Sequence, residues 1–75
     1  MNIKRDLIYI RLLGEGTLVY RPTQGLKIGG LIFKVLPTEN YNPEDENWEF
    51  PPGTIVRCQK ENKGGKEILV AVEEQ

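Results

Sequence analysis

The sequence predicts a small all-β domain, a five-stranded SH3-like barrel. The 75-residue chain is shorter than most single domains, so we expect one core. Its apolar residues fall in short runs that alternate with polar ones, which is the pattern of strands, and no run supports a helix of two turns. Prolines and glycines interrupt these runs about every eight to twelve residues, as in barrels and sandwiches. An OB-type barrel and a small β-sandwich are the alternatives.

The first half of the chain contains two expected strands. Residues 6–13 (DLIYIRLL) form the first, with Ile8, Ile10 and Leu12 on one face because side chains alternate along a strand. Residues 17–21 (TLVYR) form the second, which we expect Pro22 to end because proline has no N–H for pairing in a central strand. A glycine-containing loop over residues 23–30 then follows.

The third strand is expected at residues 31–36 (LIFKVL), with Leu31, Phe33 and Val35 sharing a face. The next proline stops it. A long acidic loop, residues 38–47, comes after the strand, and its Asn-Pro pair is typical of a turn.

The terminal hairpin is the best-defined element of the sequence. Its strands are expected at residues 54–60 and 67–73, after the tight-turn sequence Pro-Pro-Gly at 51–53. Residues 61–66 form its loop, in which Gly64 and Gly65 are free to adopt positive φ. Val56 and Cys58 share one face of the hairpin, which predicts that the cysteine is a small core residue.

The run of residues 48–58, WEFPPGTIVRC, resembles a group of short uncharacterised bacterial proteins. Those proteins also carry an upstream V-x-R-P element, here residues 19–22, and the resemblance extends over about residues 12–73. It implies no assigned activity and no catalytic residue. Residues 50–56 (FPPGTIV) also resemble the F-x-x-G-[DT]-x-V run that leads into a strand of many SH3-like barrels, which concerns the fold alone.

Charge is distributed unevenly along the chain. Residues 38–50 contain five acidic residues and no basic one, whereas the rest contains ten basic and six acidic residues, so the net charge of −1 divides into −5 and +4. Such a dipolar surface steers and orients charged partners. The simpler interpretation is a solvated loop that is acidic by composition. The five residues are Glu39, Glu44, Asp45, Glu46 and Glu49.

The residue types required by most catalytic and metal sites are missing. The chain has no histidine and no serine, and its one cysteine, Cys58, has no internal disulfide partner. The acidic run from Glu44 to Glu46 lacks the spacing of a calcium loop. We therefore expect no enzyme, no metal and no cofactor. A lone reduced cysteine and no visible export signal lead us to expect a cytoplasmic protein, and no apolar run is long enough to span a membrane, so no membrane partner is expected.

Binding of a protein partner is the leading hypothesis, through a non-enzymatic interaction module or accessory subunit. Aromatic residues and arginine are enriched at protein interfaces. Trp48 either faces a groove bordered by the acidic loop or closes the barrel as a core residue together with Phe50. Arg21 either binds a partner or pairs with the acidic loop, and we favour the pairing. The candidate site residues are Tyr20, Arg21, Tyr41, Glu44, Asp45, Glu46, Trp48 and Arg57.

Nucleic acid is the alternative partner, because small barrels bind it with aromatic platforms in basic grooves. The basic residues are spread along the chain, however, and the acidic loop repels phosphate unless it points away. We expect a monomer or a homodimer. The basic residues that such a surface would use are Lys4, Arg5, Arg11, Arg21, Lys27, Lys34 and Arg57.

Overall fold

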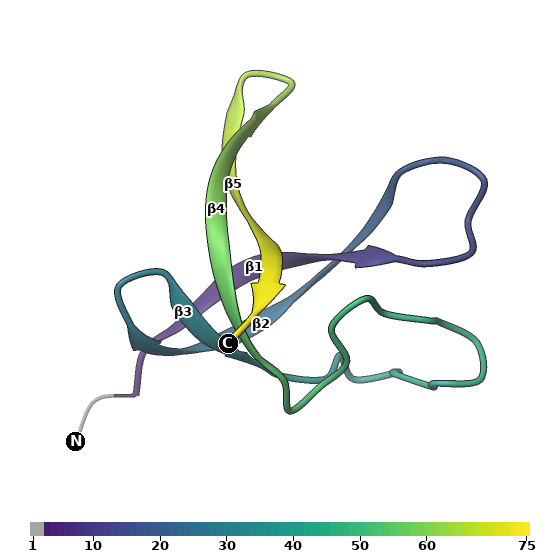
Figure 1. The fold of residues 1–75 in the computed structure, drawn as a ribbon, viewed down its shortest axis with the longest axis horizontal. Helices are drawn as coiled ribbons and strands as arrows, with labels where there is room; N and C mark the ends of the chain where they lie inside the picture. The colour runs from purple at the N-terminus through teal and green to yellow at the C-terminus, as the bar shows by residue number, and fades with distance from the viewer. Residues whose placement is uncertain (1–2) are drawn as a thin grey trace.

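A computed structural model describes residues 3–75 and shows an all-β chain of five strands (Figure 1). Each strand is hydrogen-bonded to the next, and the ring closes between the last and the first. The predicted small five-stranded barrel is therefore confirmed. Residues 3–75 contain no helix long and apolar enough to cross a membrane. The strands are β1 (Arg5–Leu12), β2 (Val19–Gly29), β3 (Ile32–Val35), β4 (Ile55–Lys63) and β5 (Lys66–Glu74).

The ring closes through one parallel seam. All consecutive strands pair antiparallel, so strand direction alternates from β1 to β5. With five strands in a ring, the last must then run in the same direction as the first. β1 and β5 do pair parallel, at Tyr9 and Val70. Parallel pairs are slightly less stable per residue than antiparallel ones.

The core lies inside the ring and follows the predicted alternation. Ile8, Ile10 and Leu12 of β1 are all buried, as are Val56 and Cys58 of β4. The predicted core-facing sides of these two strands are therefore confirmed. On β3 only Phe33 and Val35 are buried, whereas Leu31 precedes the strand and is 37% exposed.

β2 is longer than the sequence predicts, because it continues through Pro22 as far as Gly29. The reason is the direction in which its peptide groups point. The carbonyl oxygen of Gln24 accepts a hydrogen bond from the Leu36 N–H (3.0 Å), so the backbone N–H and C=O of Gln24 point away from β1. Pro22 lies two residues earlier and has the same orientation, since peptide groups alternate along a strand. Its missing N–H therefore removes nothing from the β1–β2 ladder.

Gly25, expected in a loop, is a buried part of β2 and faces the core. A Cβ atom at this position would lie 2.8 Å from Ile8 Cδ1 and 3.1 Å from Phe33 Cβ. The barrel closes tightly here because glycine allows β1 and β3 to approach each other around β2. Gly25, which the sequence predicts to lie in a loop, is therefore a packing residue.

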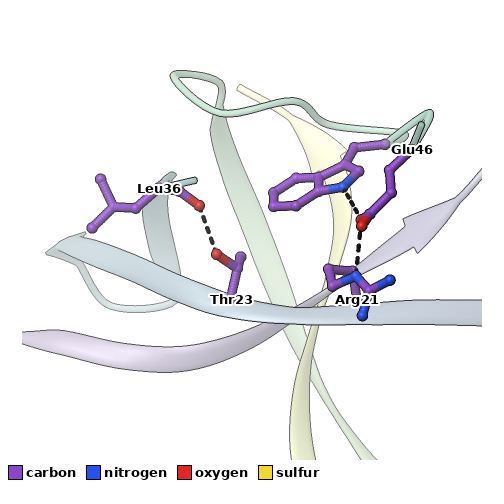
Figure 2. Close-up of polar contacts among 5 residues, drawn as sticks. Arg21, Thr23, Leu36 and Glu46 are labelled. Carbon is purple, nitrogen blue, oxygen red and sulfur yellow. Dashed lines mark hydrogen bonds and ion pairs between the residues drawn. The ribbon is translucent and has the colours of Figure 1, made fainter. Parts of the chain in front are cut away.

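The long acidic loop starts beside β2 and ends beside β1. At its start, Thr23 Oγ1 donates to the Leu36 carbonyl (2.6 Å), a contact visible in Figure 2. At its end, Leu13 N donates to Asn47 O (2.7 Å) and Glu49 N to Arg11 O (2.8 Å). In Figure 1 the loop occupies the end of the molecule opposite the β2–β3 turn.

Both predicted turns of the terminal hairpin are present. Thr54 N donates to Pro51 O (3.1 Å) across the Pro-Pro-Gly turn, where Gly53 has φ of +97°. Gly64 and Gly65 have φ of +61° and +83°, as a two-residue type I′ hairpin turn requires. The predicted loop over residues 61–66 is too long, because β4 extends to residue 63 and β5 begins at residue 66.

Candidate binding groove

One carboxylate ties the acidic loop to the barrel. Glu46 Oε1 accepts a hydrogen bond from Arg21 Nε (2.8 Å) and another from Trp48 Nε1 (2.9 Å) (Figure 2). Arg21 comes from β2, and the other two residues come from the end of the loop. The predicted pairing of Arg21 with the acidic loop is therefore confirmed.

These two donors favour the charged form of Glu46. Hydrogen bonding from the Trp48 indole, and then from the Arg21 guanidinium, holds the pKa of Glu46 below its usual value; the ionic attraction of Arg21 acts in the same direction. Partial burial opposes the shift but does not cancel it. The carboxylate is therefore ionised at neutral pH, and the loop is fixed by a charge-assisted contact.

Trp48 is a core residue. Its side chain is 3% exposed, it forms an isolated bridge with Leu12, and Tyr41 contacts it edge-on with ring centroids 4.8 Å apart. Phe50 is also buried. Of the two interpretations of Trp48, closure of the core is confirmed and exposure in a groove is wrong. The indole packs against the β1–β2 core, and Glu46 satisfies its one polar atom.

A groove does border the acidic loop, but it lies along β2. Two adjoining hollows share Pro22, Thr38 and Glu39 as lining residues. Towards one end the groove reaches the Arg21–Glu46 pair and Asn40. The lining residues of the other end are Leu7, Thr23, Gln24 and Pro37.

One edge of β2 has unpaired backbone groups and reaches this groove at Pro22. β3 pairs with β2 only from Gly25 onwards, and the Leu36 N–H donates a hydrogen bond to the Gln24 carbonyl. Tyr20 and Pro22 have the same backbone orientation as Gln24, so the Tyr20 N–H and both carbonyls point away from β1. Within residues 3–75 these three groups have no backbone partner. Sequence reasoning missed this edge, although the proline that cannot donate was its signal.

Three other candidate residues, Arg57, Glu44 and Asp45, do not line the groove. Arg57 on β4 pairs with Glu73 of β5 (2.7 Å) and lines neither hollow. Glu44 and Asp45 are exposed on the acidic loop, where their backbone N–H groups bond to Asn42. They contribute charge near the groove without lining it.

Tyr20 presents its ring on the face of β2 opposite Arg21, because neighbouring side chains alternate. Lys63 Nζ lies 5.6 Å from the centre of this ring. The tip of the terminal hairpin therefore contacts the start of β2.

The basic residues form no single surface. Arg21 and Arg57 are each paired with a glutamate, and Arg11 lies near the acidic loop, where its carbonyl bonds to Glu49. Lys4 and Lys27 are joined by a backbone hydrogen bond of 2.9 Å at the other end of the barrel. Arg5 and Lys34 flank Leu26 there, through the β1–β2 and β2–β3 registers.

Cys58 is fully buried, and burial raises the pKa of its thiol to about 11. The predicted core role is confirmed, since a protonated, enclosed thiol is a poor nucleophile. Within residues 3–75 there is no group of three or more acidic, cysteine or histidine side chains placed to hold a metal.

Comparisons of the chain with protein families, with curated proteins and with solved structures find no match.

Proposed function

We propose that the chain is a non-enzymatic protein-interaction module that holds a partner in the groove along β2. The observation that carries this proposal is the free backbone edge of Tyr20 and Pro22, which enters a groove beside the acidic loop at Pro22. A strand edge offers hydrogen bonds to any extended chain, whatever its side chains.

The charge of the groove favours a partner that carries lysine or arginine. Glu39 is exposed and lines both hollows, and the exposed Glu44 and Asp45 lie on the same loop. The one cation lining the groove, Arg21, is already paired with Glu46. The net field at the groove is therefore negative, which speeds encounter with a basic segment.

The groove is fixed before a partner arrives. Its loop side is held by the Arg21–Glu46 ion pair, and its other end by the Thr23–Leu36 hydrogen bond. A preformed site avoids the free-energy cost of ordering a loop on binding. This rigidity supports a binding role for a chain of this size.

Site-specific photocrosslinking in cells tests the proposal. A photoreactive residue replaces Asn40, which lines the groove, or Glu67, which is exposed on the terminal hairpin. We expect a protein adduct from position 40 only, and we expect Glu39→Lys to abolish it. Equal adducts from both positions, or an adduct insensitive to Glu39→Lys, would contradict the proposal.

Binding of nucleic acid is the second candidate function. The observation in its favour is that Lys4, Arg5, Lys27 and Lys34 all lie at the end of the barrel away from the acidic loop. Phosphate contacts by such residues give an affinity that falls steeply with salt. Titration of single-stranded oligonucleotides at low salt, followed by amide NMR, tests it; this function requires shifts at these four residues that Lys27→Glu with Lys34→Glu removes.

A further inference from the structure

We infer that the partner binds as an added antiparallel β-strand on residues 20–22 of β2, with a lysine or arginine side chain directed to Glu39. This inference rests on the proposed function and specifies its binding mode. The starting observation is that β2 pairs with β1 from Val19 to Leu26 but with β3 only from Gly25 onwards. Before that point one side of the strand has β1, and the other side has the groove.

The hydrogen-bonding groups of this edge define how a peptide aligns. The N–H and C=O of Tyr20 both point away from β1, on the strand edge that Pro22 continues into the groove, so they can exchange two hydrogen bonds with one peptide residue. Pro22 offers only its carbonyl, which accepts a third bond from the peptide residue two positions earlier. Leu36 N–H already occupies the next carbonyl, that of Gln24. The added strand therefore makes three backbone hydrogen bonds and stops at Leu36.

Pro22 also makes a second copy of the chain a poor occupant. If two copies paired through this edge, each Tyr20 would face a Pro22 that has no N–H to give. Half of the ladder hydrogen bonds would be missing, and the two acidic loops would face each other. Proline on an edge strand opposes self-pairing in general. A partner that supplies its own donors and a positive charge avoids both penalties.

The groove walls indicate the side chains of the added strand. Glu39 lines the whole groove and is exposed, so it suits a basic side chain. Leu7 is 45% exposed and lies with Pro37 at the end near Gln24, which suits an aliphatic side chain. Side chains of a strand that face the same way are two residues apart. The recognised segment thus carries a basic residue and an aliphatic residue two positions apart.

N-methylated peptides provide the test, because an N-methyl group removes one backbone donor and leaves the side chains unchanged. The probe is the capped hexapeptide Thr-Val-Thr-Arg-Thr-Val, titrated into the ¹⁵N-labelled chain at low salt. We expect amide shifts at residues 19–23 and 37–40, and slower hydrogen exchange of the Tyr20 amide. Only every second peptide amide faces β2. Methylation should therefore weaken binding about tenfold at alternate positions and leave it unchanged at the positions between.

Matched variants of the protein complete the experiment. Glu39→Gln should weaken binding of the peptide, whereas Glu67→Gln on the exposed hairpin should not. The inference is overturned if N-methylation at neighbouring positions has equal effects, if exchange of the Tyr20 amide does not slow, or if no shift arises at residues 19–23. A groove adduct from position 40 without the alternating N-methyl pattern would overturn strand addition alone. Absence of any adduct would overturn the proposed function as well.

Discussion

Arg21 on β2 and Trp48 at the end of the acidic loop donate to the same oxygen atom, Oε1 of Glu46. One carboxylate thus satisfies a half-exposed cation and the only polar atom of a buried indole. The contact fixes the loop at the groove and encloses the core below it. Stability and the shape of the groove therefore depend on one side chain.

Removing this carboxylate should destabilise the barrel. In Glu46→Ala the indole N–H of Trp48 loses its acceptor while the ring is 3% exposed. A buried donor without a partner costs about 1–3 kcal/mol. We expect a lower midpoint of urea unfolding, followed by Trp48 fluorescence. The matched control is Glu44→Ala, an exposed position on the same loop, which should change stability by less than about 0.5 kcal/mol. Equal losses in the two variants would show that the shared oxygen has no special role.

The same contact predicts a dependence of stability on acid pH. The pKa of Glu46 is lower in the folded chain than its usual value, because Trp48 and Arg21 hydrogen-bond its charged form. The stability that this shift contributes is complete above the unfolded-state pKa of about 4.3 and is lost as the pH falls through the folded-state pKa. Urea unfolding between pH 6 and about 3 should show the loss. Glu46→Gln should reduce the slope of the profile without abolishing it, because Arg57 also lowers the pKa of Glu73. An unchanged slope would contradict this assignment.

Gly25 should be intolerant of a side chain. The added Cβ of Gly25→Ala would lie 2.8 Å from Ile8 Cδ1, and overpacking of this kind costs about 1–3 kcal/mol. Gly29→Ala, at the end of the same strand with no atom within 4 Å, is the control. Ile8→Val removes the obstructing methyl group, so the double variant should recover part of the loss. Thermal unfolding of the unchanged chain, the two single variants Gly25→Ala and Ile8→Val, and the double variant measures this coupling. Strictly additive losses of stability would refute the steric account.

Cys58 should be protected from thiol reagents in the native chain. It is fully buried, and burial raises its pKa to about 11, so little thiolate forms and none of it is accessible. At pH 8 we expect modification by a disulfide reagent to proceed only through unfolding, at a rate that rises steeply with added urea. The fully unfolded chain in high urea gives the reference rate. Prompt reaction in native buffer would contradict the buried position.

The pattern of apolar residues was sufficient to predict the barrel. It failed at positions where contacts between strands determine whether a residue belongs to a strand or a loop. The faces of β1 and β4 follow from alternation alone, and Arg21 pairs with the acidic loop as opposite charges suggest. The secondary structure expected at Pro22 and Gly25 was wrong, because proline and glycine are residue types typical of strand ends and loops. Whether a proline breaks a strand depends on which side its peptide group faces, and this is set by the neighbouring strands.

The groove was predicted at the wrong residue for a related reason. The sequence places Trp48 between an acidic loop and a proline turn, a position compatible with display or burial. Burial is decided by Glu46, which accepts the indole N–H, and by Leu12 and Tyr41 beside the ring. Leu12 and Tyr41 are distant in sequence from Trp48, and the contact with Glu46, although only two residues away, matches no recurrent sequence motif.

The parallel seam between β1 and β5 joins the two ends of the chain. A cut within the acidic loop after residue 40 would leave two fragments, one with β1 to β3 and one with β4 and β5. These fragments meet along β3–β4, along β1–β5 and through the Arg21–Glu46 pair. Each fragment therefore carries the complementary edges of the other, so we expect the two halves to reassemble on mixing.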